Sequence, residues 1–137
     1  MEQEDKKLLL QDLCARLPYG VICHYNCVIP CGRITLEKTN ERDVLKGIIP
    51  MSDGHIGFMV GIDVNALEGD IRPYLRSLSS MTEEERKGYK HLVAFSGSSD
   101  GAANFIDWLN AHHFDHRHLI EKGLALEAPE GMYNLNK

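Results

Sequence analysis

The chain begins with hydrophobic residues at helical spacing. Within residues 1–17, apolar side chains recur at intervals of three and four positions, at Leu10, Leu13, Cys14 and Leu17. Positions with this spacing lie on one face of a helix and leave the charged residues between them to face water. We expect this amphipathic helix to end at residue 17, because Pro18 disfavours helical angles in the residue before it.

Over residues 20–78 the hydrophobic period shortens to two, which is typical of half-buried strands. The clearest strand is expected at 55–64, joined to one at 44–51 through a Ser-Asp-Gly turn at 52–54. Pro50 places the earlier strand at a sheet edge or makes it end early, since proline cannot donate to the ladder. We therefore expect a strongly curved antiparallel meander of four or five strands, as a small sheet or a partly open barrel.

Helical signals return over residues 82–123. Thr82 and Glu85 have the spacing of a capping box, in which each side chain accepts a hydrogen bond from the backbone of the other residue. This box predicts a helix that continues to about residue 95. A connector rich in serine and glycine follows it.

A second helix is expected over 102–113, and its apolar face should be inside: Phe105, Ile106 and Leu109. Trp108 lies at the edge of that face and should be partly buried. Asp115 is suited to cap a short third helix that ends before Gly123. Residues 124–137 are expected to form an extended tail.

Together these elements predict an α+β fold with an N-terminal helix, an antiparallel sheet and two or three C-terminal helices. The chain of 137 residues is 43% hydrophobic and 26% charged, so we expect residues 1–137 to form a single globular domain. A net charge of -5 disfavours general affinity for nucleic acid, which requires a positive surface.

The sequence also bears on the location of the protein. No apolar run approaches the ~20 residues that cross a bilayer. The start, MEQEDKKLLLQDL, mixes acidic and basic residues and lacks the apolar core of a signal peptide. We therefore expect no membrane association and a cytoplasmic location, where cysteine thiols stay reduced.

Three segments carry a resemblance to a known family: QDLCARLPYGV at 11–21, RPYLRSLSSMTEEE at 72–85 and FIDWLNAHHFDHRHLIEKGLALEAPEGMYN at 105–134. They resemble segments of a family of small uncharacterised proteins that are encoded in prophage-like and mobile regions of gut anaerobic bacteria. The resemblance leaves residues 22–71 largely uncovered. It implies a phage-related setting and no known activity.

Two clusters keep a metal-binding or metal-stabilised function open as an alternative. In the first, Cys23, Cys27 and Cys31 are evenly spaced. Along a strand, neighbouring thiols of this set would lie about 13 Å apart, so they converge only if the chain turns at Asn26 and again at Pro30. The other interpretation is that these cysteines serve as small buried hydrophobic residues.

The second cluster consists of four histidines within seven residues: His112, His113, His116 and His118. The first and third would share one helix face and hold a metal if the helix over 102–113 ran on. Otherwise the histidines complete that helix, since cations interact favourably with its C-terminal dipole. We expect no bound metal and no cofactor.

A nucleic-acid-associated role is a further alternative. Helices at 102–113 and 116–122 with a tight corner between them would superficially match a helix–turn–helix. The second of these helices would be only about two turns long and offers few basic side chains. The chain contains neither a nucleophile elbow nor a phosphate-binding loop, so we expect a protein that is not an enzyme.

The main functional hypothesis is a protein-binding module. Arg72, Tyr74 and Arg76 alternate along an expected strand and so share one face. Tyrosine and arginine are over-represented at binding hot spots, and Pro73 marks an edge whose backbone could accept a partner strand. Trp108 is a further candidate contact. The sequence identifies neither the partner protein nor the oligomeric state.

Overall fold

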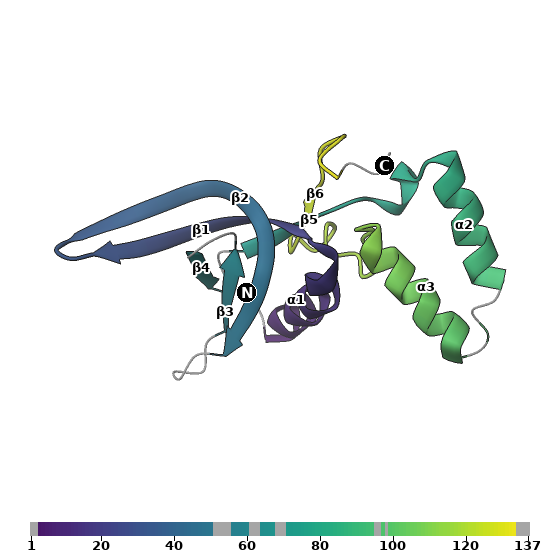
Figure 1. The fold of residues 1–137 in the computed structure, drawn as a ribbon, viewed down its shortest axis with the longest axis horizontal. Helices are drawn as coiled ribbons and strands as arrows, with labels where there is room; N and C mark the ends of the chain where they lie inside the picture. Colours follow the sequence, from purple (N-terminus) through teal and green to yellow (C-terminus); the bar gives the residue numbers. More distant parts are fainter. Residues whose placement is uncertain are drawn as a thin grey trace.

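A computed structural model of the chain describes residues 3–50, 56–60, 64–67, 71–94, 97 and 99–133. The helices and strands follow in this order: α1 (Gln3–Arg16), η1 (Leu17–Tyr19), β1 (Ile22–Cys31), β2 (Ile34–Pro50), β3 (Ile56–Val60), β4 (Val64–Leu67), β5 (Ile71–Leu75), η2 (Leu78–Ser80), α2 (Glu83–Ala94), α3 (Ser99–Ala111) and β6 (Leu126–Glu127). The N-terminal helix, the sheet and the two C-terminal helices confirm the predicted α+β fold (Figure 1).

The strands form a sheet in the order β4-β3-β2-β1-β5-β6. Five of them pair antiparallel, as expected, and the short β6 adds to β5 in parallel. The predicted meander is wrong in two respects. Residues 55–64 do not form one strand, because β3 and β4 run antiparallel and pair with each other. The next strand, β5, pairs with β1 instead of β4.

β1 and β2 form a long hairpin that extends from the body as an arm (Figure 1). Its register runs from the pair Ile22 and Val44 to the pair Cys31 and Ile34. β2 continues beyond the arm and pairs with β3 up to Pro50, which lies opposite Ile56. The edge position predicted for this strand is wrong, because β2 lies between β1 and β3. Since β4 also approaches β1, the sheet is strongly curved, as expected. The turn expected at 52–54 lies outside the described residues.

The hydrophobic core packs α1 against the sheet and against residues 119–125, which follow α3. Its buried members come from all three parts: Leu9, Leu13, Val21, Cys23, Tyr25, Leu45, Phe58, Val60, Ile71, Leu75, Leu119, Leu124 and Ala125. The sheet contributes the residues on one side of each strand, because successive side chains of a strand alternate between its faces. The opposite face of β5, β1 and β2 is left for contacts outside the core.

The buried face of α1 is the predicted one only in part: Leu13 is buried, and Leu10 and Leu17 pack against the core. Leu9 and Leu13 are buried, and the polar residues that share their face, Asp12 and Arg16, are fully buried as well. Cys14, which we expected inside, is exposed. The helix is therefore rotated by about one residue from the register that leucine spacing predicts, and it carries a charged pair into the interior.

The start of α2 confirms the predicted capping box. The backbone N–H of Thr82 donates to Oε1 of Glu85 at 2.9 Å, and the N–H of Glu85 donates to Oγ1 of Thr82 at 3.2 Å. These two bonds satisfy donors that the first turn of a helix leaves without partners. The helix ends at Ala94, close to the predicted residue.

The predicted third helix does not form. Residues 116–123 form turns, in which the Asp115 carboxylate accepts hydrogen bonds from the N–H groups of Leu119 and Ile120 at 2.8 and 3.0 Å. His113 and His118 both have positive φ angles, of 63° and 60°. A continuous right-handed helix excludes these angles, so the segment after α3 is a hydrogen-bonded loop.

The apolar face predicted for α3 is correct only in part. Leu109 is buried and Trp108 is half-buried, as expected. Phe105 is also half-buried, with its ring 5.4 Å from that of Tyr89 in α2. Ile106 is 40% exposed, so its prediction as a core residue is wrong. α3 packs on one side against α2 and leaves its other side toward solvent.

The C-terminal segment joins β1 to β5 through a tyrosine hydroxyl. The ladder between these strands pairs Cys23 with Pro73, so Ile22 and Tyr74 are the next residues in register. The Tyr133 hydroxyl lies between them, accepts a hydrogen bond from the Ile22 N–H at 2.8 Å and donates one to the Tyr74 carbonyl at 2.7 Å. The tail, expected only to be extended, thus carries β6 and a bridge that substitutes for a ladder bond.

Removing the Tyr133 hydroxyl tests this bridge. In Tyr133→Phe the ring can stay stacked on His113, but the Ile22 N–H and the Tyr74 carbonyl lose their shared partner. We expect the free energy of unfolding in urea to fall by about 1–3 kcal/mol. Tyr19→Phe is the control, since no described residue bonds that hydroxyl. Equal stability of the two variants would contradict the bridge.

Candidate functional site

A row of basic side chains crosses the solvent face of the sheet. In the strand register, His24 of β1 lies opposite Arg72 of β5 on one side and opposite Arg42 of β2 on the other. Directly opposite Cα atoms are about 5 Å apart, so the two arginine backbones are about 10 Å apart. We call these three residues the basic row.

The positive charge of the basic row is not neutralised within the described part of the chain. Both arginines are exposed, and the ion pairs of the described residues involve neither of them. His24 is half-buried, with Nε2 at 3.2 Å from Oδ1 of Asn40 and its ring edge-on to Tyr74 at 6.4 Å. Two guanidinium groups on one small face, without an ion-pair partner among the described residues, repel each other weakly and attract anionic groups.

The predicted row of Arg72, Tyr74 and Arg76 is divided in the structure. The first two do share the solvent face of β5, whose burial alternates along the strand. The side chain of Arg76 is only 12% exposed, and both of its terminal nitrogens lie 2.7 Å from the carboxylate of Glu85. Its guanidinium also lies 4.4 Å from the centroid of the Phe114 ring. Arg76 therefore joins β5 to α2 and the loop after α3, and it is not free to bind a partner.

The predicted open edge at Pro73 is closed only in part, by the pairing of the residues after it with β6. β5 lies between β1 and β6, Pro73 itself is buried, and the two residues after it pair with β6. Trp108, a residue of α3, has its ring 4.4 Å from that of His112 and 5.7 Å from that of Phe114. A Cβ atom at Gly88 of α2 would lie 3.5 Å from the indole. Trp108 thus fixes one helix against the other.

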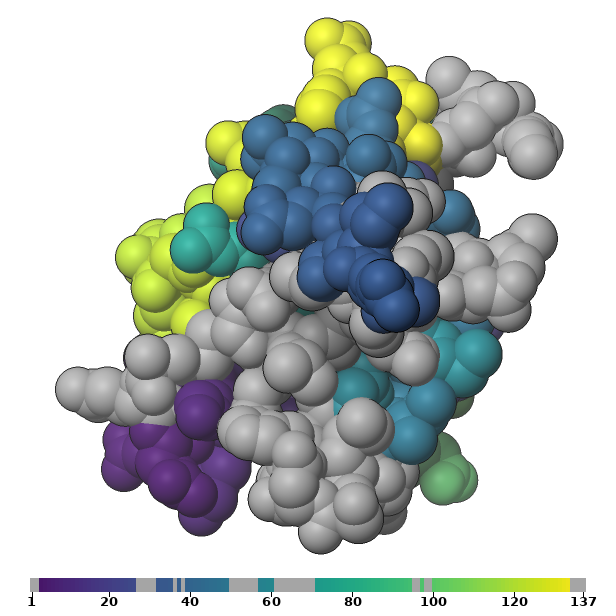
Figure 2. Space-filling model, turned by 90° about the vertical axis from the view of Figure 1, so that its left-hand side faces the viewer, coloured from purple at the N-terminus to yellow at the C-terminus, as the bar shows by residue number. Residues whose placement is uncertain are grey.

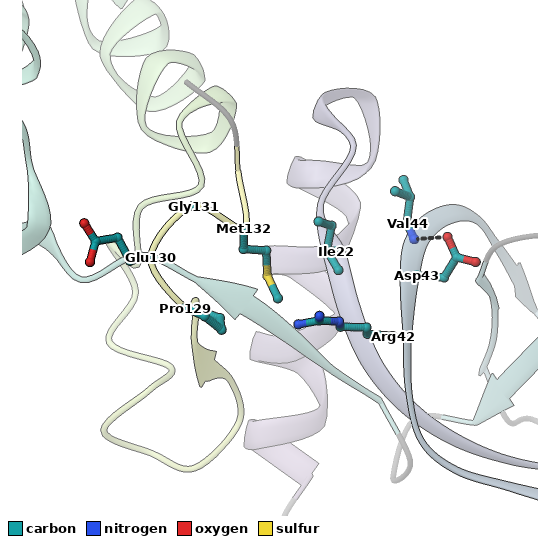
Figure 3. Close-up of a pocket in the computed structure, with 8 residues that line it drawn as sticks. All are labelled: Ile22, Arg42, Asp43, Val44, Pro129, Glu130, Gly131 and Met132. Carbon is teal, nitrogen blue, oxygen red and sulfur yellow. Dashed lines mark hydrogen bonds between the residues drawn. The ribbon is translucent and has the colours of Figure 1, made fainter. Parts of the chain in front are cut away.

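A cavity of about 480 Å³ adjoins the basic row. It is lined by residues of β1 and β2 and of the C-terminal segment: Ile22, Arg42, Asp43, Val44, Pro129, Glu130, Gly131 and Met132. Figure 3 shows the Arg42 side chain reaching from β2 toward Met132 and Pro129. In Figure 2, which looks at the molecule from the side of the arm, the blue surface of β2 lies next to the yellow C-terminal segment. Arg42 therefore belongs to both the row and the cavity.

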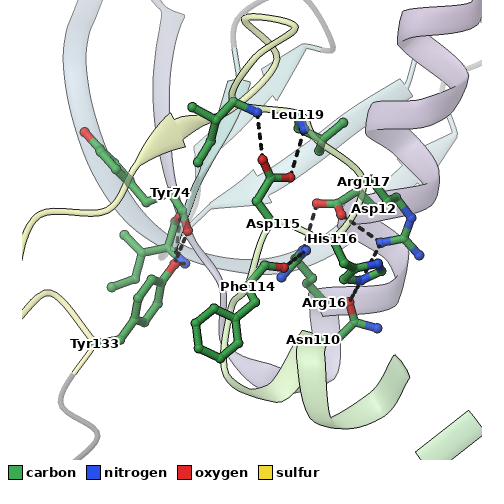
Figure 4. Close-up of polar contacts among 12 residues, drawn as sticks. Asp12, Arg16, Tyr74, Asn110, Phe114, Asp115, His116, Arg117, Leu119 and Tyr133 are labelled. Carbon is green, nitrogen blue, oxygen red and sulfur yellow. Dashed lines mark hydrogen bonds and ion pairs between the residues drawn. The ribbon is translucent and has the colours of Figure 1, made fainter. Parts of the chain in front are cut away.

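A second polar site is a buried charged network between α1 and the loop after α3 (Figure 4). Nε of Arg16 lies 2.9 Å from Oδ2 of Asp12, and both side chains have 0% exposure. Nη2 of Arg16 donates to the Phe114 carbonyl at 2.6 Å, and Nη1 of Arg117 lies 2.8 Å from Oδ1 of Asp12. These contacts tie α1 to the loop after α3. The network is separate from the cavity beside the row, because neither Asp12 nor Arg16 lines that cavity.

The four histidines have separate environments. His112 approaches the Trp108 carbonyl through Nδ1 at 2.9 Å, and the His113 ring stacks on Tyr133 with centroids 3.7 Å apart. Nε2 of His116 lies 2.9 Å from Oδ1 of Asn110, and the fourth histidine is exposed. α3 ends at residue 111, so it does not run on to align the histidines. Within the described residues no group of three or more His, Cys, Asp or Glu residues is arranged to hold a metal.

Burial makes two of these histidines sensitive to acid. Burial, followed by the nearby Arg16, lowers the pKa of His113 to about 4, and burial together with Arg117 lowers the pKa of His116 to about 4. The unfolded chain therefore binds more protons than the folded one between pH 6.5 and 4. Stability is fully present above pH 6.5 and falls with pH through this window, by roughly 3 kcal/mol for His113 and by less for His116, whose charge is partly screened by solvent.

Urea denaturation at pH 7, 6, 5 and 4 measures this loss. Although burial raises the pKa of Glu85, hydrogen bonds from Arg76 and Thr82 outweigh it and lower that pKa to about 2, so a further loss is expected below pH 4.5. His116→Asn should flatten the dependence between pH 6.5 and 4. A free energy of unfolding that is constant from pH 7 to 4.5 would contradict the assignment of neutral buried histidines.

The cysteines do not converge along β1. The strand is continuous from Ile22 to Cys31, with a bulge between Tyr25 and Cys27, and it lacks the double turn that convergence requires. Cys23 is buried and free, and burial, followed by the Asp12 charge, raises the pKa of its thiol. A raised pKa keeps the thiol protonated and unreactive. The side chains of Cys27 and Cys31 lie outside what the structure describes.

Three comparisons with known proteins yield no relative of this chain. A scan against protein-family models, a search of curated proteins and a search of solved structures find no match to the chain. In the described residues, no helix has both the length and the apolar character that a membrane crossing requires. The candidate site therefore rests on its own geometry.

Sequence reasoning found Arg72 and Tyr74 of this site but missed His24 and Arg42. Alternation along one strand identifies residues that share a face, whereas the row depends on which residues of three strands lie opposite one another. The sequence of β2 gave a strand signal only at its start, where Ile34 and Leu36 alternate with polar residues, because residues 37–43 are all polar. The pairing of that strand with β1 brings Arg42 next to His24.

Proposed function

We propose that this protein is a non-enzymatic protein-binding module. It acts in the cytoplasm as an accessory protein of a prophage or another mobile element. It contacts its partner protein through the solvent face of β5, β1 and β2, with Arg72, Tyr74, His24 and Arg42 as the contact residues. The observation that carries the proposal is the basic row, because two exposed arginines without a described carboxylate partner form a site at which a bound protein supplies the opposite charge.

The two alternatives have weaker support. A metal-binding function would need the cysteines of β1 or the four histidines to converge, and the described backbone and contacts separate them. A helix–turn–helix function would need a second helix after α3, where the chain forms turns instead. The net charge of -5 further disfavours nucleic acid, since phosphate binding depends on many cationic contacts.

Affinity capture from the native host, followed by mass spectrometry, tests the proposal. The tagged protein is compared with the charge-reversal variant Arg42→Glu/Arg72→Glu and with the control Arg86→Glu/Lys87→Glu. The control makes the same change of charge on exposed residues of α2. We expect a partner that the parent and the control recover and that the row variant loses, by about tenfold or more.

Thermal melting of all three proteins accompanies the capture experiment. Because the four substituted residues are exposed, the melting temperatures of the three proteins should agree within a few degrees. Equal recovery of every partner by the row variant and the parent would contradict the proposed surface. Loss of the partner from the control as well would show that overall charge, and not the row, governs binding.

A further inference from the structure

The basic row and the cavity beside it form one continuous surface. Arg42 takes part in both, and Ile22 and Val44, which line the cavity, lie on the same sheet face as the row, two pairs further along the ladder. From this surface we infer that the partner presents an extended acidic segment with one apolar side chain, whose carboxylates bind the arginines and whose apolar group enters the cavity. This inference rests on the proposed function and specifies the chemistry of the partner.

The charges around the row favour an acidic ligand. Guanidinium groups bind carboxylates through paired hydrogen bonds, and this geometry gives both strength and orientation. Two acidic residues of the chain line the cavity, but the Asp43 carboxylate accepts a bond from the Val44 N–H at 2.7 Å. Figure 3 shows the carboxylate of the other, Glu130, directed away from Arg42. Within the part of the chain that the structure describes, no ion pair engages Arg42, so it is available to a ligand.

The cavity adds an apolar component to the ligand. Its walls include the side chains of Ile22 and Val44 from the strands and of Pro129 and Met132 from the C-terminal segment. A volume of about 480 Å³ is in the range of pockets that hold small organic ligands, so it has room for one large aliphatic side chain. Met132 adapts its shape to such a group because its side chain is unbranched and polarizable.

The spacing of the site matches an extended peptide. The arginine backbones of the row are about 10 Å apart, and alternate residues of an extended chain lie about 7 Å apart on one face. The length of the arginine side chains covers the difference. A motif of the form Glu-x-Glu-x-Leu therefore places two carboxylates at the arginines. Because Ile22 and Val44 lie along the strands from the row, the segment turns beside Arg42 so that its leucine enters the cavity.

A peptide fits this site better than a nucleic acid does. The apolar side chains of the cavity contribute nothing to phosphate binding, its two acidic residues oppose it, and two arginines release few counterions from a polyanion. The remaining surface belongs to a chain of net charge -5, which repels a long phosphate backbone. A short acidic segment with an aliphatic residue uses the whole surface.

Titration of the ¹⁵N-labelled protein with defined probes, followed by amide chemical shifts, tests the inference. The first probe is a synthetic peptide with the core Glu-Ser-Glu-Ser-Leu between Gly-Ser ends. The second replaces both glutamates with glutamine, the third replaces leucine with alanine, and the fourth is a ten-nucleotide oligothymidylate. We expect the first peptide to shift amides around Ile22, His24 and Arg72, the glutamine peptide to bind about tenfold more weakly and the alanine peptide about fivefold more weakly.

The protein variants complete the test. Arg42→Glu/Arg72→Glu should lose the response to the first peptide, whereas Arg86→Glu/Lys87→Glu should retain it. Equal binding of the glutamate and glutamine peptides, or no shift at millimolar peptide, overturns the inference. If the partner captured from the host still depends on the arginines, the proposed function stands and only the acidic chemistry fails. Preferential binding of the oligothymidylate overturns both.

Discussion

Replacing Arg16 with alanine is expected to lower the free energy of unfolding by about 3–5 kcal/mol, as measured by circular dichroism in urea. The side chain is fully buried and contacts both Asp12 and the Phe114 carbonyl. Its loss leaves a buried carboxylate with one fewer cation and a buried carbonyl without its donor. Removal of one member of a buried pair costs much more than the pair itself contributes, because the remaining charge is no longer compensated.

Two comparisons make this result specific. Lys7→Ala removes a cation from an exposed position of the same helix and should change the free energy of unfolding by less than about 0.5 kcal/mol. The double variant Asp12→Leu/Arg16→Met should be more stable than Arg16→Ala, since it leaves no unpaired carboxylate in the interior. A loss below about 1 kcal/mol for Arg16→Ala would show that the network is not structurally required.

Replacing Phe114 with alanine is expected to cost about 3–5 kcal/mol in the same measurement. The ring has 0% exposure, lies 5.7 Å from the Trp108 ring and supports the Arg76 guanidinium at 4.4 Å. The variant therefore opens a cavity and weakens the support of the ion pair between β5 and α2. Near-UV circular dichroism should report the change around the single tryptophan.

Phe105→Ala is the matched control for this substitution. Its ring is only half-buried and contacts Tyr89 of α2, so we expect a smaller loss, of about 1–2 kcal/mol. The sequence pattern of α3 had favoured Phe105 as the core residue. If Phe105→Ala proves more destabilising than Phe114→Ala, the packing of α3 described above is incorrect.

The helices show where sequence patterns were sufficient and where they were not. The capping box at Thr82 was predictable because both partners belong to one short segment. In α1, three consecutive leucines allow several helical registers, and the choice among them depended on the assumption that charged residues face water. Asp12 and Arg16 violate this assumption, since their partners lie about a hundred residues further along the chain.

The candidate site shows the same division between local and distant information. Alternation in β5 correctly assigned Arg72 and Tyr74 to one face. It failed for Arg76, because the strand ends at Leu75 and the next residue bridges to Phe114 instead. The basic row was not predictable, since the single sequence gives no register between β1 and β2.

The hydroxyl bridge of Tyr133 has a consequence for synthesis on the ribosome. The residues it joins, Ile22 and Tyr133, are separated by 111 positions, which take about 5 to 20 s to translate at ordinary rates. During that interval the first strand has emerged while the hydroxyl that joins it to β5 does not yet exist. The nascent chain must therefore hold an incomplete sheet, and slower or faster decoding of the codons before Tyr133 would change how long chaperones have access to it.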